Sequence, residues 1–308
     1  MLLQVISHAY VHQQRMSDLD SSPSSLAPPR WLGAALVLGS AVMFSFSGIL
    51  TKAIEAGSWE VLAWRGLVGA IGIGVYVRIR GRGRPVRDVF RVGPGGWVLA
   101  IVGGIGSITF IVAFKHTFVA NVSVIYATIP FVAALLERGI LGAVVPRRTL
   151  ATAAVTLAGV AIIVGGSLGS PNLTGDAVAI AMVVLNALYM VLIRAFPATD
   201  APLAAAASSL LLFGVGWLAS DPLDVMSDDA VLLVVFGVVF ALATVLWTEG
   251  TRLIPAAESG LLGSAETPLA IGLAWLLLAE APPLLSLVGA GVVGGAIAVH
   301  LRADFGSR

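Results

Sequence analysis

The chain has 308 residues, of which 58% are hydrophobic and 11% charged, with a mean hydropathy of +0.97. Soluble domains carry about a quarter charged residues, so this composition excludes an ordinary water-soluble globular protein. The absence of cysteine excludes disulfides, thiolate catalysis and Cys-ligated metals. The four histidines lie far apart with no second ligand at helical spacing, and we therefore expect no metal and no cofactor.

The chain begins with a polar segment, residues 1–30, which predicts a disordered cytoplasmic tail. This segment has no long apolar run beside a small-residue cleavage site, so it does not have the pattern of a secretory signal peptide. A second short cytoplasmic tail is predicted at residues 302–308.

Ten apolar runs follow the tail, separated by glycine, proline or charged residues, and a hydrocarbon core about 30 Å thick needs roughly 20 apolar residues per helix. The predicted spans are 31–53, 60–78, 96–115, 118–141, 149–166, 175–195, 202–219, 230–249, 256–279 and 283–301. Most are apolar all round, whereas a helix on the surface of a soluble protein carries a polar stripe. The sequence predicts an all-α integral membrane protein with ten transmembrane helices.

The basic residues follow a pattern along these spans. Every even-numbered connection is basic, most clearly residues 78–91, whereas acidic residues gather in the odd-numbered connection 220–229. Cytoplasmic loops carry the excess of Lys and Arg, so both termini are expected in the cytoplasm and the protein in the inner (plasma) membrane. The arginine-rich run GRGRPVRDVFR also admits nucleic-acid binding, but we favour a loop held against anionic lipid and expect no nucleic acid as a partner.

The two halves of the chain resemble each other. Aligning Pro130 with Pro268 pairs Tyr126 with Ser264 and Thr128 with Glu266. Near the last helix of each half, Gly159 aligns with Gly295. The predicted repeats are residues 31–166 and 167–301. Because each copy contains five helices, an odd number, the second copy must insert inverted relative to the first, and inverted repeats are a transporter architecture.

The same residues resemble a known family, the EamA-type ten-helix exporters of the drug/metabolite transporter superfamily. The resemblance covers about residues 31–301 and rests on Pro130, Pro268, the LLLAE run ending at Glu280 and the glycine-rich VGAGVVGGAIAV that follows. The family usually has a Gly-Glu pair after both proline helices, but here the first copy reads Leu-Gly-Ala at 141–143, which weakens a functional role for Glu280. The resemblance implies export of small metabolites, often amino acids, from the cytoplasm.

Burying a polar group in a membrane costs free energy, so each polar residue in the middle of a span is a candidate for a structural or functional role. Glu266 lies two residues before Pro268, which should kink its helix and free backbone groups beside the carboxylate. Such a carboxylate suits a substrate ammonium group or a proton, although a purely structural carboxyl is the alternative. Pro130 is the second expected kink, with Tyr126 on the same helix.

The remaining candidates for the substrate site are polar or aromatic residues in other spans. Asn186 and Tyr189 share a face of one predicted helix because they lie three residues apart. The predicted substrate-binding set is Glu266, Ser264, Tyr126, Asn186, Tyr189, Ser45, Thr109 and Trp247. Phe44, Ser47 and Thr248 are further candidates for the wall. Packing is the alternative role for each, and Trp247 could instead anchor its helix at the membrane interface.

Several charged residues lie nearer the ends of spans. Arg65 is expected to reach outward or to pair with an acid such as Glu60, which is a structural role. Four residues are predicted as interfacial charges, with ion-paired gates as the alternative: Glu137, Arg138, Glu249 and Arg252.

The sequence therefore favours a secondary-active or facilitative transporter, not an enzyme, that exports amino acids or similar metabolites by alternating access and works as a monomer in the bilayer. A multidrug exporter of lipophilic cations is the alternative with the same fold, since it would depend on a deep carboxylate such as Glu266. An intramembrane hydrolase using Ser259 is disfavoured because His300, the only candidate base on the same side of the membrane, is not expected to reach that hydroxyl with reliable geometry.

Overall fold

The computed structural model describes residues 30–116, 125–126, 128–165, 173–223, 225 and 227–278, with isolated positions or short runs between 284 and 302. The regular elements in these ranges are all helices, which confirms the predicted all-α class for the described part of the chain. The predicted N-terminal tail and most of the last predicted span, 283–301, lie outside the described residues.

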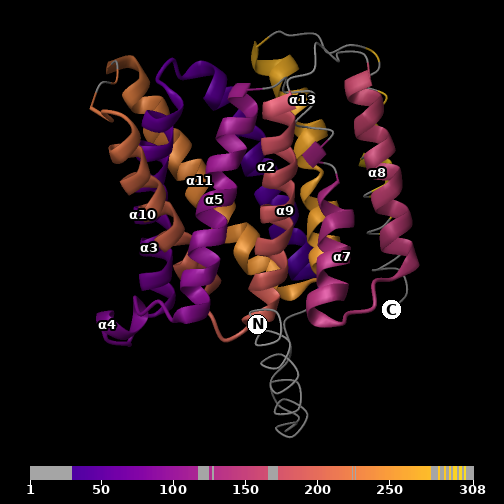
Figure 1. Cartoon of the computed structure of the whole chain (residues 1–308), viewed down its shortest axis with the longest axis horizontal. Helices are drawn as coiled ribbons and strands as arrows, with labels where there is room; N and C mark the ends of the chain where they lie inside the picture. The colour runs from indigo at the N-terminus through magenta and orange to yellow at the C-terminus, as the bar shows by residue number, and fades with distance from the viewer. Residues whose placement is uncertain are drawn as a thin grey trace, which may run out of the picture.

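The helices run along one common direction (Figure 1). They are α2 (Arg30–Ala53), α3 (Ser58–Arg80), the short α4 (Val86–Val89), α5 (Pro94–His116), α7 (Ile129–Leu141), α8 (Arg147–Gly165), α9 (Leu173–Ala195), α10 (Ala201–Ala219), α11 (Ser227–Leu253), α12 (Ala256–Gly263) and α13 (Glu266–Leu278). Seven of these helices, namely α2, α3, α5, α8, α9, α10 and α11, agree with predicted spans to within four residues at each end. Gly, Pro and charged residues mark these ends in the sequence, and this is why the apolar runs locate them well.

The span around Pro268 differs from the prediction of a single kinked helix, whereas the span around Pro130 lies partly outside the described residues. Within the predicted span 118–141, helix α7 begins at Ile129 with Pro130 in its first turn, and residues 117–124 and 127 lie outside the described range. The predicted span 256–279 is two helices, α12 and α13, separated by a turn at Ser264 and Ala265, with Pro268 in the first turn of α13. A proline is tolerated in a first turn because the amide hydrogen it lacks has no partner within the helix there.

Six of the described helices are long and apolar enough to cross a membrane, judged by length and composition: α2, α3, α5, α9, α10 and α11. Large apolar side chains cover their outer surfaces; Leu218 is 89% exposed, and Ile71, Val75 and Leu242 are also exposed. So much exposed apolar surface suits a hydrocarbon surrounding better than water. The count of ten spans stays a prediction.

Close contacts between helices of the two halves hold the bundle together. Helix α3 packs along α10, and α2 along α11. A Cβ atom built on Gly216 of α10 would lie 2.5 Å from the Cβ of Ala63 and 2.9 Å from the carbonyl oxygen of Trp59, so only glycine allows α3 to approach this closely. Small residues at such crossings are typical of membrane helix pairs.

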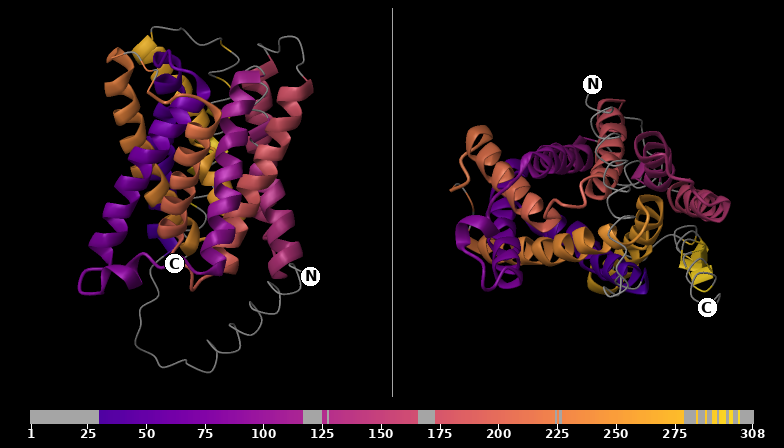
Figure 2. Two further views of the ribbon diagram at one scale, coloured as in Figure 1. Left: turned by 60° about the vertical axis from the view of Figure 1, so that its left-hand side comes forward. Right: turned by 90° about the horizontal axis from the view of Figure 1, so that it is seen from below.

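Seen along the bundle, α8 lies at its outer edge (Figures 1 and 2). Helix α8 contacts α7 and α12, whereas α5 packs against both α9 and α10, around a shared apolar core that includes Leu99, Met182 and Met190. The residues between α2, α3, α5, α9, α10 and α11 are therefore enclosed by helices from both halves of the chain.

Ion pairs between the two halves gather at the end of the bundle where α3 ends and α5 begins. These pairs are Arg30 with Glu258 at 2.6 Å, Arg194 with Glu137 at 2.6 Å, and Arg80 with both Glu249 and Asp200. Each joins a residue of the first half to a residue of the second. The predicted interfacial charges Glu137 and Glu249 are therefore both paired across the halves, and Arg252 also lies 3.7 Å from Glu249.

Candidate functional site

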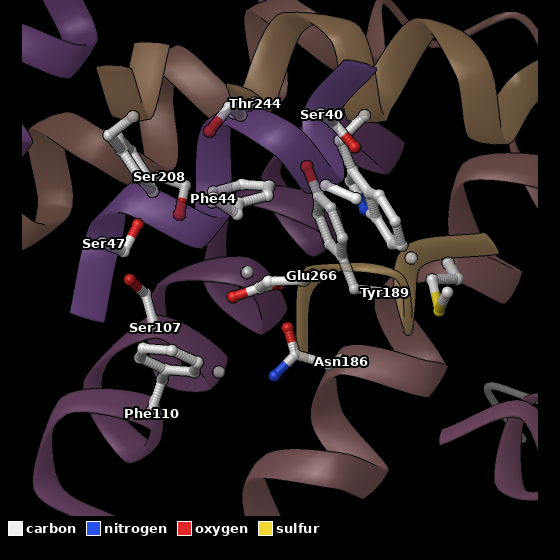
Figure 3. Close-up of a pocket in the computed structure, with 18 of the residues that line it drawn as sticks. Ser40, Phe44, Ser47, Ser107, Phe110, Asn186, Tyr189, Ser208, Thr244 and Glu266 are labelled. Atoms are coloured by element: carbon white, nitrogen blue, oxygen red, sulfur yellow. The ribbon is translucent and has the colours of Figure 1, made fainter. Parts of the chain in front are cut away.

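A cavity at the centre of the bundle is the candidate site (Figure 3). Its volume is about 140 Å³. Its walls come from α2, α3, α5, α9, α10 and α11, together with the start of α7 and the α12–α13 region. Because these elements belong to both halves of the chain, a molecule bound in this cavity would touch both halves at once.

The walls combine hydroxyls with aromatic rings. The hydroxyl-bearing residues are Ser40, Ser47, Ser107, Ser208, Ser209, Thr244, Tyr126 and Tyr189. The other aromatic residues are Phe44, Phe110, Phe240 and Trp247. Such a lining suits a small molecule with both a polar and an apolar part, since a few placed polar groups orient it while rings enclose the rest.

Arg65 of α3 supplies a positive charge to this cavity. The residue is 3% exposed, its Nη2 donates to Ser107 Oγ at 2.6 Å, and its guanidinium lies 4.5 Å from the ring centroid of Phe240. No carboxylate lies within ion-pair distance of it among the described residues, and its buried Nε donates to no partner. A buried guanidinium without a counter-charge is costly, so an anionic group in the cavity would complete its environment.

Glu266 supplies a carboxyl group to the same cavity. It is the first residue of α13, directly after the turn at Ser264 and Ala265, and Figure 3 shows its carboxylate among Ser47, Ser107 and Asn186. A carboxylate in the first turn of a helix interacts favourably with the helix dipole. Within the described residues its side chain has neither an ion pair nor a hydrogen bond, which leaves its oxygens open to a ligand.

Five of the eight predicted substrate-binding residues line the cavity: Glu266, Tyr126, Asn186, Tyr189 and Trp247. The side chain of Asn186 donates to the carbonyl oxygen of Met182 at 2.9 Å, so its own amide oxygen remains as an acceptor. The ring of Tyr126 packs edge-on against Phe110, with centroids 6.4 Å apart. Trp247, for which an interface anchor was the alternative, forms part of the cavity wall.

The other three predicted residues do not line the cavity. Ser45 and Ser264 are buried, and their hydroxyls donate to backbone carbonyls of Val42 at 2.6 Å and Gly260 at 2.9 Å. Thr109 likewise donates to Gly106 at 2.9 Å. Helical phase explains two of these positions, because Ser45 and Thr109 each lie about 100° around their helices from the face that meets the cavity.

Arg65 is the residue that sequence reasoning missed. The expectation that it reaches outward or pairs with Glu60 is wrong, because the side chain is buried and bonds to Ser107. The available signal was its position inside an apolar span, where an ionisable residue is by default a candidate for function. Ser107, Ser208 and Phe240 were also missed, since a single serine or phenylalanine in an apolar helix carries no such signal.

Residues 31–165 match the model of the EamA-like transporter family. No curated protein matches the chain. A solved structure, described only as the crystal structure of a protein, is 20% identical with a TM-score of 0.76, over 88% of this chain and 97% of that one. At this identity the likeness shows the fold alone. Together with the six long apolar helices, the family match indicates a multi-pass membrane protein that is a transporter.

Proposed function

We propose, from the EamA-like transporter domain in residues 31–165, that this chain exports amino acids or similar small metabolites by alternating access through the central cavity. The observation that carries the proposal is that Arg65 and Glu266 line one cavity without pairing with each other. Two opposite charges that stay apart are complementary to a molecule that carries both charges itself.

An amino acid at neutral pH is such a molecule. Its carboxylate can accept from the guanidinium of Arg65, whose Nε is the unsatisfied donor, and its ammonium group can donate to Glu266. The rings of Phe44, Phe110 and Trp247 would then surround its side chain. Binding of a zwitterion therefore satisfies both buried charges and adds no net charge to the cavity.

A lipophilic cation is less well matched to this cavity. Glu266 would attract it, but Arg65 lines the same space and repels a second positive charge. The hydrolase alternative has no support in the geometry, because Ser259 is fully buried, outside the cavity lining, and its Oγ has no hydrogen-bond partner among the described residues that could act as a base.

The wider architecture remains part of the proposal: ten spans in two inverted repeats, both termini in the cytoplasm, a monomer in the inner membrane. The family match is confined to residues 31–165, the range predicted as the first repeat, which supports a two-repeat chain. Pro130 and Pro268, paired by the predicted repeat, both lie in the first turn of a helix.

Counterflow uptake of labelled amino acids into proteoliposomes tests the proposal. Arg65→Gln and Glu266→Gln should each lower apparent affinity about 10- to 100-fold, because each removes one charge-assisted hydrogen bond of about 1.5–3 kcal/mol. Arg138→Gln and Glu55→Gln are matched controls, since both residues are exposed and outside the cavity, and they should transport like the unaltered protein.

The specificity of these effects matters as much as their size. An amine that lacks the amino acid's carboxylate should compete poorly with the unaltered protein and lose little in Arg65→Gln. Amino-acid uptake unchanged by either substitution would contradict the proposed site. Uptake of dye cations but of no amino acid would instead support the multidrug exporter.

A further inference from the structure

A second cavity lies at the end of the bundle, away from the central site. Its volume is about 280 Å³. It lies between the end of α3, the short helix α4, the start of α5 and the loop from α9 to α10. The polar side chains in its lining are Arg80, Arg84, Asp88, Arg91, Thr199 and Asp200. The arginine-rich run of the sequence, which the transport proposal does not use, therefore folds around a pocket.

The charges in this pocket do not balance. Arg80 is already bound by Asp200 and by Glu249 of α11. Arg84 and Arg91 have no ion pair or side-chain hydrogen bond among the described residues, and Asp88 is the one remaining carboxylate in the lining. Two free guanidinium groups against one carboxylate leave an excess of positive charge, and guanidinium groups bind phosphate oxygens with two donors at once.

The backbone at the start of α5 adds donors to the same pocket. Gly93 and Gly96 line it, on either side of the residue that begins α5. A Cβ atom on Gly93 would meet nothing within 4 Å, whereas one on the buried Gly96 would lie 2.9 Å from Val92. Pro94, which begins α5, has no amide hydrogen, so the first amides of the helix are those of Gly95 and Gly96. The first amide groups of a helix have no partner within the helix, and they favour an anion placed beside them.

The position of the pocket identifies where such an anion would come from. The candidate spans Ser58–Arg80, Pro94–Ala113, Ala177–Ala195 and Ala201–Ala219 all have an end here, so the pocket lies at the level where apolar helices meet the polar surroundings. Val86, Phe90 and Trp97 expose apolar surface on α4 and at the start of α5. Acyl chains could contact these side chains, and tryptophan is enriched at this level of a membrane.

We propose that this pocket binds a phosphate group, and that its usual ligand is the headgroup of an anionic phospholipid. The phosphate accepts from Arg84 and Arg91 and from the first amides of α5, while Arg80 stays in its ion pairs and holds the wall in place. A free phosphate anion has the same chemistry, so the experiment must separate the two sources.

Native mass spectrometry of the purified full chain in neutral detergent measures this binding directly. Phosphatidylglycerol, phosphatidylcholine and inorganic phosphate are titrated separately. The double variant Arg84→Gln/Arg91→Gln should weaken phosphatidylglycerol binding at least about tenfold. The double variant Arg82→Gln/Arg87→Gln removes the same charge from the same loop. All four arginines are exposed, but Arg82 and Arg87 lie outside the pocket lining, so this variant should leave binding within about twofold.

Each outcome supports or overturns the proposed lipid site. Selective loss of phosphatidylglycerol in Arg84→Gln/Arg91→Gln supports a lipid site, and the same pattern for inorganic phosphate alone supports a soluble anion. An equal loss of phosphatidylglycerol binding in both double variants would mean that general surface charge attracts the lipid, and it would overturn the proposed pocket. No loss of binding in either variant would overturn it as well. An unchanged melting temperature of Arg84→Gln/Arg91→Gln without lipid shows that the fold is intact. None of these results depends on transport, so the central site can fail or hold independently.

Discussion

Gly142 ends helix α7 with φ of 65°, in the left-handed region that favours glycine. Its amide donates to the carbonyl oxygen of Arg138 and so closes the last turn. In the resembling family, the position after this glycine carries a glutamate that this chain lacks. The glycine is therefore explained by the end of the helix alone, without a role in transport.

Gly142→Ala should lower the free energy of unfolding by about 1–2 kcal/mol, because a Cβ atom is strained at this φ whatever space surrounds it. Gly139→Ala is the matched control: Gly139 is within the same helix, exposed and free of neighbours within 4 Å, so alanine there should stabilise by about 0.5–1 kcal/mol. Thermal unfolding in detergent compares the two. Equal effects would contradict this account of the helix end.

At the scale of elements, glycines decide how closely the helices of the two halves approach. Gly216 of α10 faces Ala63 of α3, and Gly66 of α3 faces the backbone of Ser209 and Phe213 on α10. Helices α3 and α10 therefore come into backbone contact at two positions along their length, at Gly66 and at Gly216. Gly33 of α2 and Gly250 of α11 form a similar crossing between the other helix pair.

Gly216→Ala should lower the melting temperature, because its Cβ atom would lie 2.5 Å from that of Ala63 and the helices would have to separate. Overpacking of this kind typically costs about 1–3 kcal/mol. Gly214→Ala, two residues away with nothing within 4 Å, should be neutral or slightly stabilising. A similar loss in both variants would indicate a general effect on α10 instead of the crossing.

At the scale of the whole molecule, the ion pairs between the halves gather at one end. Glu137 is buried, accepts from Arg194 and also lies 3.4 Å from the amide of Ala256, so α7, α9 and α12 meet at one carboxylate. At the opposite end the contacts between halves include Asp229, which accepts from the amides of Glu55 and Ala56. On the proposed transport route, we expect a path from the central cavity past the arginine-rich end to require these ion pairs to separate.

Neutralising these pairs should therefore open that end. The chain has no cysteine, so Ser208→Cys places a single thiol in the cavity wall. Adding Glu137→Gln, Glu249→Gln and Glu258→Gln should raise its labelling by an impermeant thiol reagent, applied from the arginine-rich side, several-fold. Glu55→Gln, at the other end, should leave labelling unchanged. No increase in the triple variant would mean that these pairs do not hold the end closed.

Much of the fold could be predicted because it depends on properties read along the chain. The length of each apolar run and the residues that interrupt it determine where a helix begins and ends, so α2, α3, α5 and α8 to α11 lie close to their predicted spans. The prolines at 130 and 268 marked interruptions correctly in position. Both lie in the first turn of a described helix, which accommodates proline without loss of a hydrogen bond. Around Pro268 the chain forms two helices separated by a turn instead of a single kinked one.

The candidate site could be predicted only in part. Glu266, Asn186 and Tyr189 were found because a polar group in an apolar span must point toward other polar groups. The hydroxyls of Ser45 and Thr109 instead donate to backbone carbonyls of their own helices. Either kind of partner is compatible with the sequence, so the sequence does not predict which one a hydroxyl finds.

By itself, the sequence determined that this protein is helical, apolar enough for a membrane, and divided into helices at recognisable residues. Only the tertiary structure decided which face of each helix meets the cavity. The physical reason is that a helix apolar all round has no stripe to define its rotation, so its orientation depends on packing against neighbours distant in sequence. Arg65 illustrates this: its place beside Ser107 and Phe240 follows from the approach of α3 to α5 and α11.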